Sequence, residues 1–274
     1  MTDKAAAEAT GAELLPIMIG AAQEAGTLLL GQFKAARSLP RSEKTAGDFV
    51  TEADLASERL LRKRLLSARP GYGWVGEETG VSGDPEGLRW IVDPLDGTTN
   101  FLHGLPHWAV SIALAHGARV IAGVIHDPVK AETFSATAGA GAWLDRRRLH
   151  VSSGVTLSHA LLATGVPAGG RITYLSDAMR DINDLMPDCA GIRRWGAAAL
   201  DLAYVAAGRI DAYWERNLGP WDVAAGMVLV TEAGGWVHPL WQDRSVLESG
   251  SFLAVNTELG ATLAARLCPG GPAS

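Results

Sequence analysis

The stretch WIVDPLDGTTNF, residues 90–101, restricts the possible folds of this chain more than any other. An apolar run, typical of a buried strand, stops at Asp93, and a proline, a second acid at Asp96, a glycine and two threonines follow. Pro94 and Gly97 favour a turn that brings Asp96 back beside Asp93. The same residues also fit a surface turn, so their meaning depends on the rest of the chain.

The rest of the chain alternates between helix and strand patterns, which predicts a layered α/β fold with two sheets. Helical spacing of apolar residues predicts helices over residues 14–29 and 51–70, and Thr51 with Asp54 predicts a capping box at the start of the second. The other expected helices cover residues 172–186, 197–208, 220–235 and 258–267. The expected strands cover residues 88–93, 107–117, 119–128, 131–145, 159–165, 191–195, 209–215 and 251–256, and a polar loop is expected over residues 41–50.

Composition argues against several classes of protein. The chain has 274 residues, of which 47% are hydrophobic, and this suits one large domain or two closely joined halves. A net charge of −6 argues against direct binding to nucleic acid. Cys189 and Cys268 stand far apart in the sequence, so we expect no disulfide framework and no zinc site. With no signal-peptide pattern and no unbroken apolar run of about 18 residues, we expect a cytoplasmic protein without a membrane span.

Acidic residues recur where the predicted strands end and the predicted helices begin. They are Asp48, Asp54, Glu77, Glu78, Asp93, Asp96, Glu215 and Asp222. Such ends gather ligand sites in α/β folds, and carboxylates that meet there repel one another unless a cation neutralises them. Because carboxylate oxygens are hard ligands, the pattern indicates Mg²⁺. Two ions about 4 Å apart would activate a water and stabilise a leaving oxygen, while backbone N–H groups of residues 97–99 hold phosphate oxygens.

Each acid also has an ordinary structural explanation. Asp54 fits a helix cap, and Asp222 fits the first turn of a helix, where an acid faces the positive end of the helix dipole. Glu215 fits an ion pair with a base such as Arg216, and residues 77–78 fit an exposed turn. These explanations are independent of one another, whereas one shared site accounts for all the acids together.

Other metal and phosphatase patterns do not fit. His103 and His107 are four residues apart, but a glycine and a proline lie between them, so we do not expect them to be ligands on one helix. Phosphatases of the haloacid dehalogenase type, which use an aspartate nucleophile, carry their two acids two residues apart. Asp93 and Asp96 are three apart, so a covalent aspartyl-phosphate is not expected.

The acidic motifs resemble those of the inositol monophosphatase family, within the wider lithium-sensitive, magnesium-dependent phosphatases. The motifs are GEE at residues 76–78, WIVDPLDGTTNF at 90–101 and WDVAAG at 221–226, supported by GDFVTEAD at 47–54 and GAAALDLAYVAAGRIDAYWE at 196–215. The resemblance covers roughly residues 12–260. It implies an α-β-α-β-α five-layer sandwich with two sheets, formed as a single domain over residues 1–274. The N-terminal half would end near residue 155, the C-terminal half would start near 156, and the site would lie between them.

The resemblance also implies an activity. The chain would be a phosphoric monoester hydrolase that acts on inositol-1-phosphate, or on a related polyol or sugar phosphate, through a metal-activated water. Histidinol-phosphate phosphatase activity, fructose-1,6-bisphosphatase activity and a mainly regulatory binding role of the same fold stay open as alternatives. Its partner would be a small-molecule phosphate ester, the assembly would be a homodimer, and lithium would inhibit.

Site residues are carried over from the family by position. One Mg²⁺ would bind Glu77, Asp93 and the carbonyl of Leu95, and a second would bind Asp93, Asp96 and Asp222. A third, weaker ion would lie near Glu77 and Asp48. The catalytic residues would be Glu77, Asp54 and Thr98, with Thr98 supported by Asp54 and helping to activate the water.

Substrate contacts follow from the same resemblance. Gly97 and Thr98 would bind phosphate through backbone amides, Glu215 with residues Gly196, Ala197 and Ala198 would meet the polyol hydroxyls, and Lys44 would lie near the site. The family commonly has threonine or serine where this chain has Ala197. A hydroxyl contact contributes to discrimination between substrates, so its absence is expected to loosen or change substrate preference while leaving the metal ligands intact.

Overall fold

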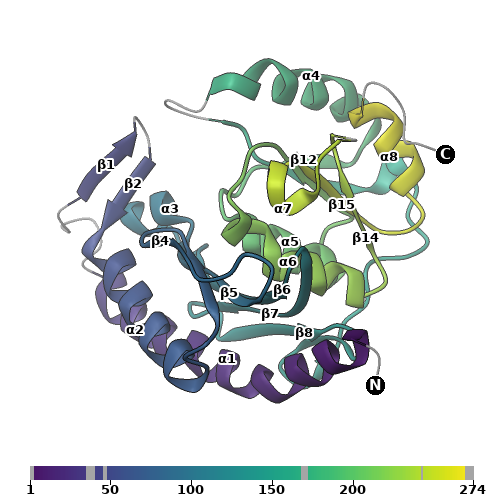
Figure 1. Cartoon of the computed structure of the whole chain (residues 1–274). Helices are drawn as coiled ribbons and strands as arrows, with labels where there is room; N and C mark the ends of the chain where they lie inside the picture. Colours follow the sequence, from purple (N-terminus) through teal and green to yellow (C-terminus); the bar gives the residue numbers. More distant parts are fainter. Residues whose placement is uncertain (1–2, 35–40, 46–47, 168–171, 242, 269–274) are drawn as a thin grey trace.

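The computed structural model describes residues 3–34, 41–45, 48–167, 172–241 and 243–268, with side chains described from residue 8 and, after the first helix, from residue 51. Two sheets alternate with three layers of helices, which confirms the predicted α-β-α-β-α sandwich (Figure 1). The acidic motifs of the sequence lie on the larger sheet, within the middle helical layer and on the smaller sheet. The position of that layer therefore decides whether they meet.

The larger sheet contains eight strands. In spatial order they are β10 (Arg147–Arg148), β9 (Gly141–Leu144), β8 (Glu132–Thr137), β7 (Arg119–Asp127), β6 (Ala109–His116), β5 (Leu88–Asp96), β3 (Gly73–Gly76) and β4 (Gly80–Ser82). Neighbours are antiparallel except for β3 and β5, which are parallel. Helices α1 (Asp3–Phe33) and α2 (Glu52–Ala68) cover one face, and α5 (Ala198–Ala206) and α6 (Pro220–Glu232) cover the other.

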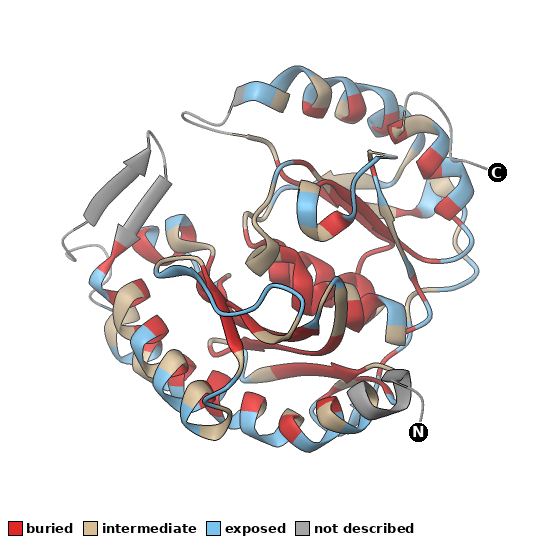
Figure 2. Cartoon of the chain, viewed as in Figure 1, coloured by how far each residue is buried: buried red, intermediate tan, exposed pale blue. Residues whose placement is uncertain are grey.

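The smaller sheet contains five strands. In spatial order they are β12 (Gly191–Arg193), β11 (Leu161–Thr164), β13 (Ala212–Glu215), β15 (Phe252–Val255) and β14 (Trp236–Pro239). Its inner face meets the middle helices α5 and α6. Its outer face packs against α4 (Leu175–Leu185) and α8 (Gly260–Leu267), with the short α7 (Val246–Ser249) at the rim. Every residue of α5 is buried, as expected for a helix enclosed by two sheets (Figure 2).

The first helix, α1, carries the apolar residues that predicted it. Over Glu8–Phe33 its length and composition are those of a helix that could cross a membrane. The expectation of no membrane span rested on the lack of an unbroken apolar run, which Glu13 and Glu24 interrupt, whereas the mean hydropathy of the helix is high despite these two acids. In the structure, Leu14, Met18 and Leu29 are buried, and the helix packs on β6, β7 and β8 (Figure 2). Its apolar side therefore contributes to the core.

Two local predictions were wrong. Residues 41–50, predicted as a loop, contain the antiparallel strands β1 (Arg41–Thr45) and β2 (Asp48–Thr51). A two-stranded ribbon need not bury one face, so its polar sequence lacks the alternation by which strands are recognised. Strand β5 was expected to end at Asp93, but it continues to Asp96. The capping box of Thr51 and Asp54 at the start of α2 is confirmed.

Candidate active site

Asp93 and Asp96 face the same side of the larger sheet because β5 contains a bulge. Residues three apart in a regular strand point to opposite faces. Here Asp93 pairs with Ser111 and Asp96 with Ala109, so three steps on β5 oppose two steps on β6. The Leu95 N–H donates to Asp93 Oδ1 at 2.9 Å within the bulge. A bulge, rather than the predicted turn, therefore brings the two acids together.

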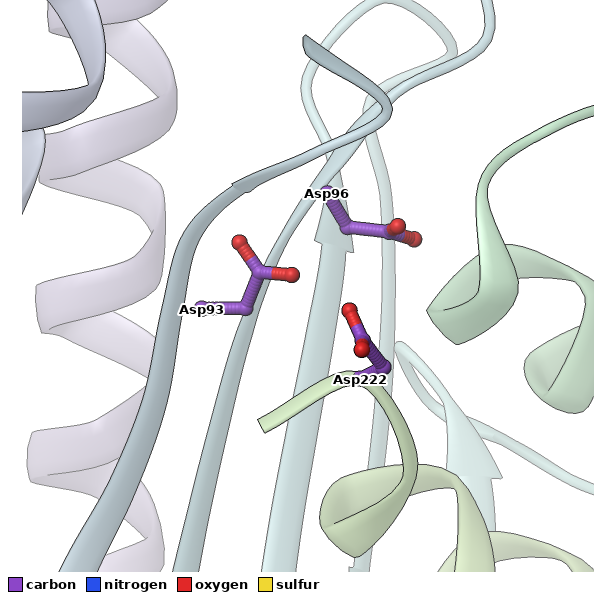
Figure 3. A group of neighbouring side chains, drawn as sticks. All are labelled: Asp93, Asp96 and Asp222. Atoms are coloured by element: carbon purple, nitrogen blue, oxygen red, sulfur yellow. The ribbon is translucent and has the colours of Figure 1, made fainter. Parts of the chain in front are cut away.

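A third acid joins them from the C-terminal half. Asp93, Asp96 and Asp222 each offer a carboxylate oxygen, and these oxygens all lie within 4.8 Å of one another (Figure 3). Asp222 is the third residue of α6, and it accepts a hydrogen bond from the Gly219 N–H at 2.7 Å. Asp222 thus lies in the first turn of its helix, as its ordinary explanation required, and also joins Asp93 and Asp96 in what we call the acidic cluster.

Asp93 and Asp96 are buried, Asp222 is half-buried, and the charges of the three carboxylates repel one another. Burial, followed by the charges of Glu77, Asp96 and Asp222, raises the pKa of Asp93 well above its usual value. Burial, followed by the charge of Asp222, likewise raises the pKa of Asp96. Hydrogen bonds from backbone amides oppose both shifts only partly. A cation bound among these oxygens would remove the repulsion.

The two neighbouring glutamates at the end of β3 have different positions. Glu77 lines the pocket beside the acidic cluster, and its N–H donates to the Val92 carbonyl at 3.2 Å. The Glu78 N–H instead donates to Glu58 Oε2 at 2.7 Å, and Glu78 is not among the residues that line the pocket. Both glutamates lie in a turn, as expected, but both are half-buried rather than exposed.

Thr98 contacts Asp54 as the family resemblance implied. The Thr98 hydroxyl lies 2.9 Å from Asp54 Oδ1 and 3.0 Å from the Leu95 carbonyl, so its one proton is donated to one or the other. The other oxygen of Asp54 accepts from the Thr51 N–H and hydroxyl. Burial raises the pKa of Asp54. Asp54 therefore acts as a helix cap and as a partner of Thr98 at once.

The start of α5 binds Asp96 directly. The Ala198 N–H donates to Asp96 Oδ1 at 3.2 Å, and the Ala199 N–H donates to Asp96 Oδ2 at 2.8 Å. The amide of Ala198, expected to meet the substrate, is thus occupied by an acid of the cluster. Ala199 had no predicted role, because its contact depends on a partner 103 residues away.

The acidic cluster lies in the wall of a cavity of about 450 Å³. The predicted residues that line it are Glu77, Asp93, Leu95, Asp96, Gly97, Thr98, Gly196, Ala197, Ala198, Glu215 and Asp222. Lining residues that sequence reasoning missed include Asn100, Arg194, Asp201, Arg216 and Asn217. Lys44 on β1 and Asp48 on β2 were also predicted, but their side chains lie outside the described residues.

Glu215 stands at the end of β13 and accepts a hydrogen bond from the Tyr213 hydroxyl. The neighbouring base, Arg216, was considered as its ion-pair partner. Arg216 instead pairs with Asp181 on α4 and donates to the Leu267 carbonyl. Glu215 lines the pocket, as the resemblance implied.

Ala197 is the N-cap residue of α5 and has no side-chain cap bond. Ala197 is 1% exposed. Its methyl group packs against Gly97 so closely that a Cβ atom introduced at Gly97 would lie 3.3 Å away. We expect Ala197→Ser to stabilise the protein by about 1 kcal/mol, because a serine oxygen can accept from the first turn of the helix. Urea unfolding followed by circular dichroism measures this. Ala198→Ser, one residue beyond the cap position, is the matched control, and an equal gain in both variants would contradict the capping argument.

Comparisons with known proteins agree with this geometry. The model of the inositol monophosphatase family matches residues 11–269. The inositol-1-monophosphatase of Rhizobium meliloti is 44% identical over 91% of this chain and 94% of its own length. The Nus factor SuhB of Pseudomonas aeruginosa is also 44% identical, over 95% of this chain and 98% of its own length. A crystal structure of the extragenic suppressor protein suhB from Bartonella henselae superposes with a TM-score of 0.89 at 40% identity, covering 94% of this chain and 99% of that one. The chain therefore belongs to the inositol monophosphatase family, a family of phosphoric monoester hydrolases.

Proposed function

We propose that this enzyme hydrolyses inositol-1-phosphate or a related polyol or sugar phosphate with the help of bound Mg²⁺. The observation that carries the proposal is the cluster of Asp93, Asp96 and Asp222, whose oxygens lie within 4.8 Å of one another in the wall of a cavity of about 450 Å³. A cavity of this size suits a small phosphate ester. The name of the Rhizobium meliloti relative supports the choice of substrate.

The donor set of the acidic cluster fits Mg²⁺. All its donors are oxygens, and burial together with the neighbouring acids raises the pKa values of Asp93 and Asp96, which a bound cation would offset. We assign one ion to Glu77, Asp93 and the Leu95 carbonyl, and a second to Asp93, Asp96 and Asp222. A third would lie near Glu77 and Asp48. Bound Mg²⁺ supplies charge that polarises the phosphate and lowers the pKa of a bound water.

The protein's own groups position the reacting atoms. When the Thr98 hydroxyl donates to Asp54 Oδ1, its lone pairs are free to accept a hydrogen bond from the attacking water, which orients that water. Glu77 follows β3 and lines the pocket, and it would accept the proton that the water loses. The backbone amides of Gly97 and Thr98 contact the phosphate as individual donors, because α3 (Thr98–His103) is too short to add much of a helix dipole.

The opposite wall of the pocket contacts the alcohol part of the substrate. Glu215 accepts hydrogen bonds from polyol hydroxyls, and the hydrogen bond from Tyr213 holds it in place. Gly196, Ala197 and Ala198 shape the same wall, and Lys44 contributes from β1. Since all these groups except Lys44 come from the C-terminal half, and the phosphate contacts come from the N-terminal half, the two halves work as one domain.

A panel of phosphate esters tests the proposal. With Mg²⁺ present we expect kcat/KM for inositol-1-phosphate to exceed that for histidinol phosphate, fructose-1,6-bisphosphate and phosphoadenosine by about tenfold or more, which corresponds to about 1.4 kcal/mol of discrimination. Phosphate release should stop in EDTA and fall with millimolar lithium. If another ester gave the higher kcat/KM, that ester would replace inositol-1-phosphate as the assigned substrate. No release from any ester would contradict it.

A regulatory binding role is the second candidate, favoured by the name of the Pseudomonas aeruginosa relative, Nus factor SuhB. Such a role would use the surface of the fold rather than the acidic cluster. A pull-down in which Asp96→Asn captures the same partner as the unchanged protein would support it, and loss of capture would count against it.

We also propose that the protein is a cytoplasmic homodimer that makes no direct contact with nucleic acid. Light scattering during gel filtration measures the mass of the assembly.

A further inference from the structure

Asn100 lies in the pocket wall, and no role in metal or substrate binding has been assigned to it above. It belongs to α3 and is 8% exposed. Its side-chain Nδ2 lies 2.8 Å from the His107 carbonyl, 2.8 Å from the Trp195 carbonyl and 3.4 Å from the Gly196 carbonyl. Three carbonyl oxygens around one end of the amide require that this end is the NH₂ group. Both N–H donors are therefore satisfied by main-chain acceptors.

The Asn100 side chain joins parts of the chain that are far apart in sequence. The His107 carbonyl belongs to the segment between α3 and β6, whereas Trp195 lies 95 residues beyond Asn100 and directly precedes Gly196. One side chain thus ties a short helix of the N-terminal half to the segment 195–198 of the C-terminal half. Segment 195–198 is the part of the chain to which polyol contacts are assigned.

Segment 195–198 needs such support. Gly196 has a φ of +78°, a conformation in which the backbone of the segment turns away from β12 before α5 begins. Ala197 packs close to Gly97, and the amides of Ala198 and Ala199 bind Asp96. Packing on Gly97 and hydrogen bonds to Asp96 thus hold the C-terminal end of the segment. Asn100 holds the N-terminal end, at Trp195 and Gly196.

We propose that Asn100 is a positioning residue that holds segment 195–198 in the shape required to bind the alcohol part of the substrate. The inference rests on the proposed function for its kinetic part and on geometry alone for its structural part. Loss of the amide leaves two partly buried carbonyl groups without this donor, and the segment then gains freedom at the end farthest from Asp96. Substrate binding should weaken more than the chemical step, because Asn100 contacts neither the acidic cluster nor Thr98.

Asn100→Leu tests the proposal, because leucine has a similar size and no donor. We expect KM for inositol-1-phosphate to rise by about tenfold, the loss expected for a hydrogen-bonded contact, with kcat changed by less than about threefold. Hydrogen exchange followed by mass spectrometry should show faster exchange in a peptide spanning residues 193–200, and unchanged exchange in α1. Asn100→Asp, which is also without donors, is measured in parallel and decides the question if the leucine variant does not fold.

Leu105→Ala is the control, since Leu105 is 51% exposed, lies just beyond α3 and touches neither carbonyl through its side chain. It should leave both KM and exchange unchanged. Unchanged exchange over residues 193–200 in the Asn100 variants would overturn the proposal, and so would a fall in kcat at constant KM. If the unchanged protein released no phosphate, the proposed function would fail, but faster exchange in the variants would still support the structural tie.

Discussion

Asp96→Asn is expected to reduce Mg²⁺-dependent phosphate release by about a thousandfold or more while leaving the fold intact. Asp96 contributes a carboxylate oxygen to the acidic cluster, and an amide is neutral and a far weaker ligand for Mg²⁺. A thousandfold loss corresponds to about 4 kcal/mol of transition-state stabilisation, within the range that metal-bound charge supplies. Steady-state kinetics with inositol-1-phosphate at saturating Mg²⁺ measures the loss.

Two opposing effects should keep the Asp96→Asn protein folded. Asparagine has one acceptor oxygen, so one of the two bonds to the amides of Ala198 and Ala199 is lost, which costs about 1 kcal/mol. The variant also removes a buried charge that repels Asp93 and Asp222, and this offsets the loss. Circular dichroism and the midpoint of urea unfolding check that the loss of turnover is not a loss of structure.

Asp201→Asn is the matched control. Asp201 is also a buried aspartate in the pocket wall, 2% exposed, but it does not belong to the acidic cluster. We expect its kcat to stay within about tenfold of the unchanged protein, since no metal ligand is removed. Near-normal turnover in Asp96→Asn, or an equal loss in both variants, would contradict the assignment of Asp96 as a metal ligand.

The sequence was most informative where one short segment carries both the structure and the chemistry. Thr51 and Asp54 are three residues apart, so a capping box could be recognised from local spacing alone. The spacing of Asp93 and Asp96 indicated a shared site, but the bulge that makes them neighbours depends on the register against β6. Register is set by the partner strand, and a single strand's sequence does not contain it.

The contacts of Asn100 and Ala199, two pocket or cluster residues that sequence reasoning missed, join segments that are distant in the sequence. Asn100 meets Trp195, and Ala199 meets Asp96 across 103 residues. An asparagine in a polar turn and an alanine in an apolar helix have no local signal that marks them as site residues. Asp201 likewise enters the pocket because α5 packs against β6 and β7, and Arg194 enters it from the segment between β12 and α5.

Mg²⁺ is expected to stabilise the enzyme strongly at alkaline pH and hardly at all at acidic pH. Burial and mutual repulsion raise the pKa values of Asp93 and Asp96 in the metal-free folded protein, so this state binds protons more tightly than the unfolded chain does. Stability from these two groups is therefore present at low pH and is lost as pH rises through their raised pKa values. Mg²⁺ binds the deprotonated carboxylates, so its stabilising effect grows over the same range.

The measurement is the difference in Tm between samples with Mg²⁺ and samples with EDTA, taken from about pH 5 to pH 8. At about 100 times the dissociation constant, Mg²⁺ contributes about 2.7 kcal/mol, which raises Tm by roughly 5 °C or more in a protein of this size. Burial lowers the pKa of His107 to about 4, so unfolding takes up a proton there at acidic pH and changes both samples equally. The difference between the samples cancels this effect.

The same measurement of Tm with Mg²⁺ and with EDTA, made on the Asp96→Asn variant, distinguishes binding of Mg²⁺ at the acidic cluster from binding at other sites. Exposed acids elsewhere would give a small shift in Tm that the variant retains, because surface carboxylates bind Mg²⁺ weakly. Loss of the shift in Asp96→Asn, together with its growth from pH 5 to pH 8 in the unchanged protein, assigns the stabilisation to Asp93, Asp96 and Asp222. A shift of equal size at every pH, or one that persists in the variant, would mean that these carboxylates do not bind the ion.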